Sequence, residues 1–204
     1  KFPPVLLGGS SAALARAVLF PDKDAFADGL YIGEIEPHAR EFFETLQHTR
    51  GAGAAAAVQE LARRIPAFYP IEPGRPADSG PVFPPAPARA AAPWKQPSSV
   101  VFDGAQADTV KLEISRGCPA FCSFCHEAWE RRPYRELPAD TILQTARRLA
   151  IETGASTVEV SAFNFNTHRD IARILDGLHR IFDRVNLMSQ RADVLARHSW
   201  MLPL

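Results

Sequence analysis

The sequence predicts an α/β protein in two parts joined by a Pro-rich connection. After position 109, strand-like runs alternate three times with helical stretches, a pattern that specifies a parallel sheet with right-handed crossovers. Residues 1–65 show the same rhythm. Ten of the chain's 18 prolines lie between positions 66 and 97, which disfavours helix and central strand there. We therefore expect the tail of one α/β domain over 1–65, a connection over 66–108 and a second domain over 109–204.

Composition indicates a chain that buries a core but whose net charge points to no particular partner. The 204 residues are 46% hydrophobic, and 23 Lys and Arg balance 23 Asp and Glu. Nucleic-acid and anionic-membrane binders usually carry a basic excess, so the net charge gives no nucleic-acid footprint, and we expect no membrane partner. No apolar run approaches a bilayer span and no leader opens the sequence, which predicts a soluble, cytoplasmic protein. Because the chain begins at Lys1 rather than Met, we expect a piece of a longer protein.

The first part is expected to open with a strand, a glycine turn and a helix. The turn contains Gly8 and Gly9, directly after an apolar run. In a later helix, Phe42, Phe43 and Leu46 are expected to share one face. The expected elements are strands over 5–7 and 30–32 and helices over 11–20, from 37 onwards and over 54–65.

The connection over 66–108 contains aromatic side chains that favour a segment packed against the domains over a disordered one. These aromatics are Phe68, Tyr69, Phe83 and Trp94.

The second part is expected to form a parallel sheet. A helix over 138–153 ends at Gly154, and Thr167 with Asp170 forms a capping-box pattern before another helix. The expected strands cover 110–114, 158–160 and 185–188. Because ligands bind at the carboxyl ends of parallel strands, we expect the three strand ends to face one cavity.

All three cysteines of the chain follow the first of these strands in the spacing CxxxCxxC. Cys118, Cys122 and Cys125 leave no cysteine for a disulfide elsewhere. Three thiolates in one loop suit three corners of a cubane iron-sulfur cluster and leave the fourth iron open to a substrate-like ligand.

A zinc site and a ferredoxin-type cluster are the two alternatives for this loop. A zinc site needs four protein ligands, and His126 directly follows Cys125, where it is poorly placed to join the same ion. A ferredoxin uses four cysteines at other spacings. The open-corner cluster is favoured over both, and a non-enzymatic iron-sulfur or zinc module stays the alternative function.

The cysteine motif resembles the signature of the radical S-adenosylmethionine (SAM) superfamily, which has an aromatic residue before its third cysteine, here Phe124. The resemblance implies a partial (βα) barrel of which the first three βα units are present, a 4Fe-4S cluster on the three cysteines, and SAM on the open iron with Phe124 near the adenine. It implies reductive cleavage of SAM to a 5'-deoxyadenosyl radical. It also implies an electron donor such as flavodoxin or ferredoxin.

Flanking residues resemble radical SAM proteins that have an N-terminal cobalamin-binding domain. The matching stretches are 113–119, 132–136 and 33–36, together with Gly8 and Gly9. The resemblance implies that residues 1–65 are the C-terminal part of a Rossmann-like domain and that the glycine pair lies near a cobalamin tail. A plain strand-to-helix turn explains the glycines equally well. Methyl transfer, methylthio transfer to RNA and radical rearrangement all stay open.

Polar residues that follow the second and third strands are candidates for binding SAM. The resemblance places the methionine end of SAM beside the second strand, where this sequence departs from the usual Gly-Gly-Glu and has Ser161 and Asn164. Ser189 and Arg191 follow the third strand, and arginine suits a carboxylate. Hydrogen bonds within their own loop explain Ser161 and Asn164 equally well, and an exposed arginine at a helix start, paired with Asp193, is the alternative for Arg191. We favour a solvated face for Arg131, Arg132 and Arg135, and assign no role to His126, His168 and His198.

Overall fold

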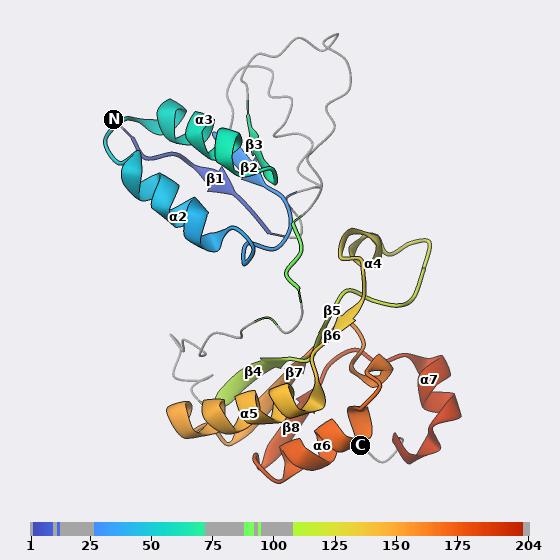
Figure 1. Cartoon of the computed structure of the whole chain (residues 1–204). Coiled ribbons are helices and arrows are strands. Elements are labelled where there is room, and N and C mark those ends of the chain that lie inside the picture. The colour runs from blue at the N-terminus through green and yellow to red at the C-terminus, as the bar shows by residue number, and fades with distance from the viewer. Residues whose placement is uncertain are drawn as a thin grey trace. The chain divides into compact units, whose positions relative to one another are not determined.

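The computed structural model describes residues 2–9, 12, 27–71, 88–91, 94 and 108–201. Within it the chain divides into two compact units, unit 1 over Lys1–Ala90 and unit 2 over Ala91–Leu204. Each unit has its own sheet and its own helices (Figure 1).

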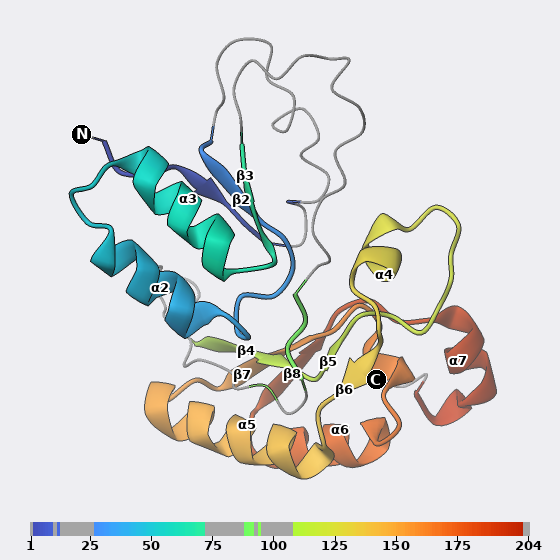
Figure 2. The same ribbon diagram turned by 45° about the horizontal axis from the view of Figure 1, so that its top comes forward.

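Unit 1 contains a three-stranded sheet in the order β1 (Leu6–Leu7), β2 (Gly29–Tyr31) and β3 (Phe68–Pro70). β1 and β2 run parallel, whereas β3 pairs antiparallel with β2. Two helices, α2 (Ala39–His48) and α3 (Ala54–Arg64), pack against each other, and α3 contacts β3. Both helices lie on the same side of the sheet (Figure 2).

The core of unit 1 is built from apolar residues of β2, β3 and α3. Leu61 and Ile65 are fully buried, and they cluster with Tyr31 and Phe68. The expected helix face is partly wrong: Phe42 packs against this core, but Phe43 is 63% exposed. Residue 43 lies about 100° around the helix axis from residue 42, so it points away from the sheet.

The described residues of the predicted connection pack within the units: those up to residue 90 contact unit 1, and Trp94 contacts unit 2. Phe68 and Tyr69 lie in β3, and Ala88 pairs with Gly33 through a parallel bridge in unit 1. Trp94 is buried in unit 2, where its indole N–H donates to Glu113 at 2.7 Å. Phe83 and most of the expected helix over 11–20 lie outside the described residues.

Unit 2 contains the parallel sheet that the sequence predicts. Its order is β4 (Thr109–Glu113), β7 (Thr157–Ser161) and β8 (Arg184–Leu187), and both pairings are parallel. Two helices, α5 (Ala139–Thr153) and α6 (Ile171–His179), connect the strands and pack against each other (Figures 1 and 2). The predicted arrangement of three adjacent parallel strands is confirmed, and the barrel stays a prediction.

Alternating burial explains this sheet. Val110 and Leu112 of β4 and Val158 and Val160 of β7 are fully buried, as period-2 side chains on a covered face should be. α5 ends at Gly154, which adopts the left-handed conformation with φ of 69° as the sequence predicts.

The predicted capping box is not formed. α6 begins at Ile171 with Asp170 as its N-cap, and that carboxylate makes no capping hydrogen bond. Thr167 instead lies in the short 3₁₀ helix η3 (Phe165–Thr167), where its hydroxyl donates to the carbonyl of Asn164 at 2.8 Å. The turn before α6 therefore satisfies Thr167 locally and removes it from the helix end.

Short elements complete unit 2. β5 (Ser115–Arg116) and β6 (Arg135–Glu136) form a small antiparallel hairpin that periodicity does not predict. Helix α4 (His126–Glu130) lies in the loop that this hairpin closes, and α7 (Ala192–Arg197) follows β8. The 3₁₀ helix η4 (Ser199–Met201) ends the described chain.

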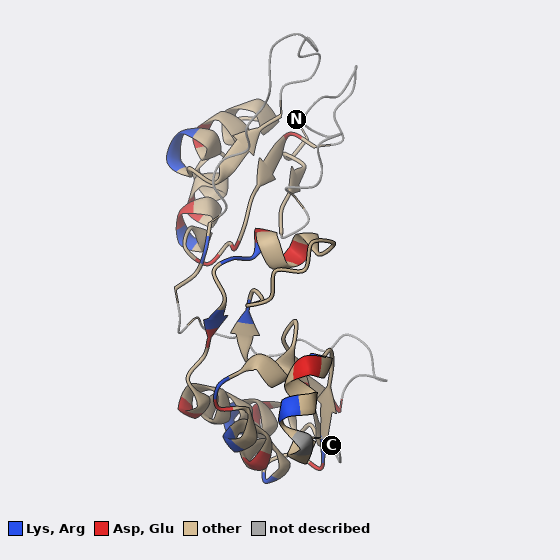
Figure 3. Ribbon diagram, turned by 90° about the vertical axis from the view of Figure 1, so that its right-hand side faces the viewer, with Lys and Arg blue, Asp and Glu red and all other residues tan. Residues whose placement is uncertain are grey.

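Basic and acidic positions are interspersed along the helices of each unit (Figure 3). Several of them form ion pairs one helical turn apart, such as Arg40 with Glu44 and Arg148 with Glu152, each at 2.8–2.9 Å. Such exposed pairs contribute little to stability, because water and salt screen their attraction. None of the described helices combines the length and apolar character needed to cross a membrane.

Candidate cysteine site at the carboxyl ends of the parallel strands

The cysteine loop begins directly beyond the carboxyl end of β4. The hairpin of β5 and β6 closes it at its base, where Ser115 pairs with Glu136 and Arg116 with Arg135. The amide of Leu137 donates to the carbonyl of Ile114 at 3.0 Å and extends this closure by one hydrogen bond. The two ends of the loop over 117–134 are therefore held together beside the sheet.

Gly117 makes the turn from β5 into the cysteines. Its φ of +77° lies in the left-handed region that side chains disfavour. A Cβ atom at this position would lie 2.5 Å from the carbonyl oxygen of Arg131 and 3.0 Å from that of Pro133. Glycine thus allows the outgoing and returning arms of the loop to pack backbone against backbone.

The three cysteines are free thiols of different exposure. Cys118 is buried, with 8% of its surface exposed, whereas Cys122 and Cys125 are half-buried. The amide of Cys125 donates to the carbonyl of Cys122 at 3.1 Å, which forms a tight turn before α4. The side-chain amide of Asn164 donates to Cys118 Sγ, with 3.3 Å between Nδ2 and sulfur.

Stacked aromatic and arginine side chains brace the loop. The Arg132 guanidinium lies over the rings of Phe121 and Trp129, 3.9 Å from each centroid. The Trp129 indole N–H donates to the carbonyl of Cys122 at 3.1 Å. Phe124 points into solvent with 89% of its surface exposed. The turn at Cys122 is thereby tied to α4, while Phe124 is left accessible.

The basic cluster after the cysteines, Arg131, Arg132 and Arg135, makes contacts that stabilise the loop. Arg131 pairs with Glu127 at 2.9 Å and lies 5.3 Å from the ring centroid of Phe163. Arg135 donates to the carbonyl of Pro133 at 3.1 Å. With Arg132 stacked on two aromatic rings, these arginines have structural contacts that the prediction of a solvated face did not include.

Residues at the carboxyl ends of β7 and β8 bond to neighbouring segments and to the cysteine loop. Ser161 accepts the amide of Ile114 through its carbonyl at 3.1 Å, and Ser189 accepts the amide of Phe165 in the same way at 3.1 Å. Asn164 lies against Cys118. The structure thus brings Asn164 to the cysteines, and it shows Ser161 and Ser189 making main-chain bonds between neighbouring loops.

Asn166 is a structural residue that the sequence reading missed. Its buried amide donates to the carbonyl of Arg191 and accepts the Arg191 amide, both at 2.9 Å. This reciprocal pair joins the turn after β7 to the start of α7. Its sequence signal was a second asparagine in a polar loop after a strand, but the partner lies 25 residues away and no local pattern points to it.

Arg191 directs its guanidinium to Asp193 at 2.9 Å. This hydrogen bond is the main cause that raises the pKa of Arg191 above its usual value, and Cys122 and Cys118 act in the same direction only as thiolates. The bond also holds the pKa of Asp193 below its ordinary range. A fixed cation therefore lies within electrostatic reach of two of the three thiols.

A cavity of about 580 Å³ opens beside the cysteine loop. The loop contributes Pro119 and Ala120, and basic residues of the neighbouring elements contribute to the remaining wall. Those basic residues are Arg169, Arg191, Arg197, His168 and His198. Asp193 also lines the cavity and pairs with Arg191 and Arg197, so the wall carries charges of both signs.

A hydrogen-bond network stabilises the end of the cysteine loop, where residues 134–136 lead into and form β6. The Tyr134 hydroxyl donates to Glu136 at 2.8 Å, and burial raises the pKa of Tyr134 to about 12. Burial is the largest single influence on Glu136 and acts to raise its pKa, but the hydrogen bonds from Arg169, at 2.6 Å, and from Tyr134 act together to hold that pKa below its usual value. His168 is buried and contacts the carbonyl of Leu137 at 2.9 Å, in agreement with a structural rather than a ligand role.

The donor set fits an iron-sulfur cluster by its chemistry. Three free thiols lie in one braced loop, and thiolate is the usual ligand of such clusters. Within the described ranges, no three His, Cys, Asp or Glu side chains are grouped to share a single metal ion. A cubane makes a different demand, because each thiolate binds its own iron atom at a separate corner. Cys118, Cys122 and Cys125 are the residues that would hold it.

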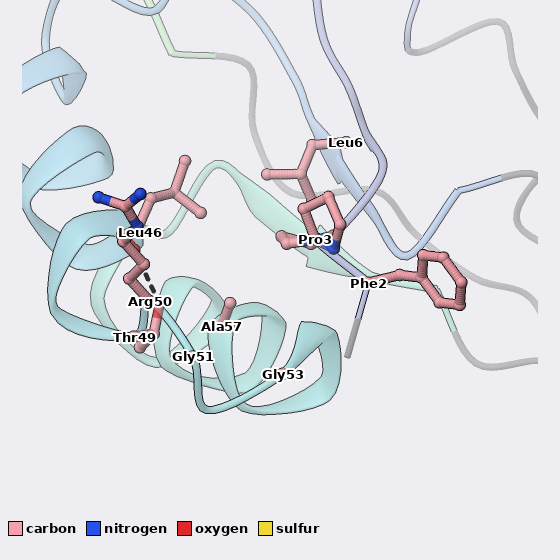
Figure 4. A pocket seen from close by; sticks show the side chains of 10 residues that line it. Phe2, Pro3, Leu6, Leu46, Thr49, Arg50, Gly51, Gly53 and Ala57 are labelled. Carbon is pink, nitrogen blue, oxygen red and sulfur yellow. Dashed lines mark hydrogen bonds between the residues drawn. The ribbon is translucent and has the colours of Figure 1, made fainter.

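The glycine pair of unit 1 follows β1. Gly9 has φ of +102° and pairs with Gly33 through an antiparallel bridge. A separate cavity of about 410 Å³ in this unit has Phe2, Pro3 and Leu6 on one side (Figure 4). Leu46, the loop at 49–53 and Ala57 form the other side. Among the described residues that line it, Gly8 and Gly9 do not appear.

Unit 2 is therefore a parallel α/β domain with a three-thiol loop at the carboxyl end of its first strand. Residues 112–192 match the family model of the radical SAM superfamily. The matched segment runs from β4 through the cysteine loop to the start of α7. This match supports a radical SAM domain and, with it, a radical SAM enzyme. No curated protein matches the chain.

Proposed function

We propose that the protein cleaves SAM reductively at a 4Fe-4S cluster held by Cys118, Cys122 and Cys125. The observation that carries this proposal is the closed CxxxCxxC loop at the carboxyl end of β4, inside the segment that matches the radical SAM superfamily. When bound, the cluster supplies one electron to the sulfonium of SAM, which breaks into methionine and a 5'-deoxyadenosyl radical.

The side chains around the loop have separate tasks in this proposal. Arg191, fixed by Asp193, orients the carboxylate of SAM, because a guanidinium pairs well with a carboxylate. Ser161 and Ser189 offer polar groups at neighbouring strand ends, and the exposed ring of Phe124 covers the adenine. Asn164 donates its side-chain amide to the sulfur of Cys118. The braced loop keeps these groups in place while an external electron donor reaches the cluster.

The finer assignments stay predictions. A cobalamin contact at Gly8 and Gly9, and a methyltransferase or methylthiotransferase type of reaction, rest on the sequence resemblance. A non-enzymatic iron-sulfur or zinc module is the competing function. Such a module would bind metal but would release no product from SAM, whereas the proposed enzyme releases one.

That product is 5'-deoxyadenosine. The reconstituted full chain, reduced with dithionite in the presence of SAM, should release it, and liquid chromatography measures the amount. Cys122→Ala should reduce it to background, because two thiolates do not hold the cubane. Ser123→Ala is the matched control, since it changes the exposed neighbour of Cys122 and should leave product formation intact. No product from the reconstituted wild-type chain, or equal product from Cys122→Ala, would contradict the proposal.

A further inference from the structure

Asn164 occupies a position from which it contacts a proposed cluster ligand. Its Nδ2 lies 3.3 Å from the sulfur of Cys118, the most buried of the three cysteines. Sulfur is a weak acceptor as a thiol, but a thiolate bound to iron carries negative charge and accepts an N–H more strongly. Burial of Cys118 further strengthens this bond, because little water competes for the sulfur.

The backbone that carries Asn164 is held from two sides. Its carbonyl accepts both the hydroxyl of Thr167 at 2.8 Å and the Thr167 amide at 3.2 Å. Phe165, the next residue, is 2% exposed, and its amide donates to Ser189 at 3.1 Å. Asn166 then bonds the backbone of Arg191 twice. The amide of Asn164 is thus presented to Cys118 by a fixed turn rather than by a mobile loop.

We propose that Asn164 is a positioning residue that donates a hydrogen bond to the ligating sulfur of Cys118 and raises the reduction potential of the cluster. The proposal rests on the proposed function. Reduction adds negative charge to the cluster and its thiolates, so a donor at sulfur stabilises the reduced state more than the oxidised state. An amide provides this donor without a net charge and without a proton that titrates.

The direction of the effect separates this role from simple packing. Loss of the donor lowers the potential, because the reduced state loses more stabilisation than the oxidised state. A loosened loop that admits water raises the potential, because water also stabilises the more charged reduced state. The two explanations for an altered Asn164 variant therefore predict shifts of opposite sign.

The test is a potentiometric titration of the reconstituted full chain, followed by electron paramagnetic resonance of the reduced cluster. Asn164→Leu keeps a similar side-chain volume and removes the donor. Asn164→Asp keeps the shape, removes the donor and adds a negative charge near the sulfur. Asn186→Leu is the matched control, because Asn186 is an exposed asparagine on β8.

We expect the midpoint potential to fall in Asn164→Leu, to fall further in Asn164→Asp, and to stay at the wild-type value in Asn186→Leu. An unchanged or raised potential in a loaded Asn164→Leu protein would overturn the proposal. If that variant takes up no iron, the same comparison applies to Asn164→Asp. Failure of both variants to load, with a loaded control, would show that Asn164 is needed to hold the cluster and would also overturn it. A wild-type chain without a cluster contradicts the proposed function instead.

Discussion

Single residues determine whether the cysteine loop can close. Gly117 has a left-handed backbone and lies close to the Arg131 carbonyl. A side chain at this position would therefore be unfavourable for two separate reasons, backbone strain and a steric clash. At Asn166 a single buried side chain bonds both the amide and the carbonyl of Arg191, and it is the partner that satisfies the amide. Both residues support the site without being ligands.

Gly117→Ala should destabilise the protein by more than the left-handed conformation alone accounts for. A non-glycine residue in that conformation costs about 1–2 kcal/mol, and the added Cβ would lie 2.5 Å from a backbone oxygen. Gly154→Ala is the matched control, because its φ of +69° is similar but a Cβ there meets nothing within 4 Å. Urea unfolding should show a larger loss for Gly117→Ala. Equal losses would mean that the two arms of the loop do not pack as described.

Asn166→Ala should also destabilise the protein, by about 1–3 kcal/mol, because it removes two hydrogen bonds and leaves the amide of half-buried Arg191 without its partner, while the Arg191 carbonyl keeps the amide of Leu195. The same urea titration measures it. Asn186→Ala, at an exposed asparagine, should have little effect. A loss no larger than that of the control would argue against the reciprocal pair.

At the scale of elements, Asp108 connects the three strands of the parallel sheet at the end opposite to the cysteines. Its carboxylate accepts the amide of Ser156 at 2.7 Å and pairs with Arg184 at 3.2 Å. Asp108 thus joins the beginnings of β4, β7 and β8. The hydrogen bonds from Ser156, assisted by Arg184, hold the pKa of Asp108 below its usual value.

This lowered pKa predicts a pH dependence. A carboxyl group with a lower pKa in the folded state stabilises the fold above its unfolded pKa of 3.8, and this contribution is lost as the pH falls through the folded value. Asp108→Asn should therefore lose less stability than the wild type when the pH is lowered from about 5 towards 2. Thermal unfolding at several pH values measures it. Asp183→Asn removes another exposed carboxylate of unit 2 as a control, and equal pH dependence in the wild type and Asp108→Asn would contradict the prediction.

The elements differ in how far the sequence predicts them. β4, β7 and β8 alternate more and less exposed residues over at least four positions, so periodicity predicts the strands, and the helices between them predict their parallel pairing. The hairpin of β5 and β6 has only two residues on each side, with charged residues in both, and its partners lie about 20 residues apart. Local pattern cannot predict such a pairing, because tertiary contacts and not propensity create it.

The same distinction applies to the site. The spacing of Cys118, Cys122 and Cys125 indicates their chemistry directly, because ligand type and spacing are local properties of the sequence. The contact of Asn164 with Cys118 joins residues 46 positions apart, and the stacking of Arg132 between two aromatic rings depends on the fold of the loop. The capping box predicted at Thr167 is wrong, because the Thr167 hydroxyl donates to the carbonyl of Asn164 in its own turn instead of capping the helix.

At the scale of the whole molecule, the chain combines two α/β units with separate cores. The match to the radical SAM superfamily lies entirely in unit 2, as do the three cysteines and the cavity of about 580 Å³ beside them. Unit 1 has its own mixed sheet and its own apolar cavity. The central claim therefore concerns the thiols of unit 2, and it can be tested in the intact chain.

The most direct test of that claim is the iron and sulfide content of the full chain after anaerobic reconstitution. We expect about four irons and four sulfides per chain with a broad brown absorption. Cys122→Ala should lose most of this iron, whereas Ser123→Ala should keep it. Stoichiometric zinc without retained iron in the wild type, or full iron content in Cys122→Ala, would contradict the assignment of a 4Fe-4S cluster to Cys118, Cys122 and Cys125.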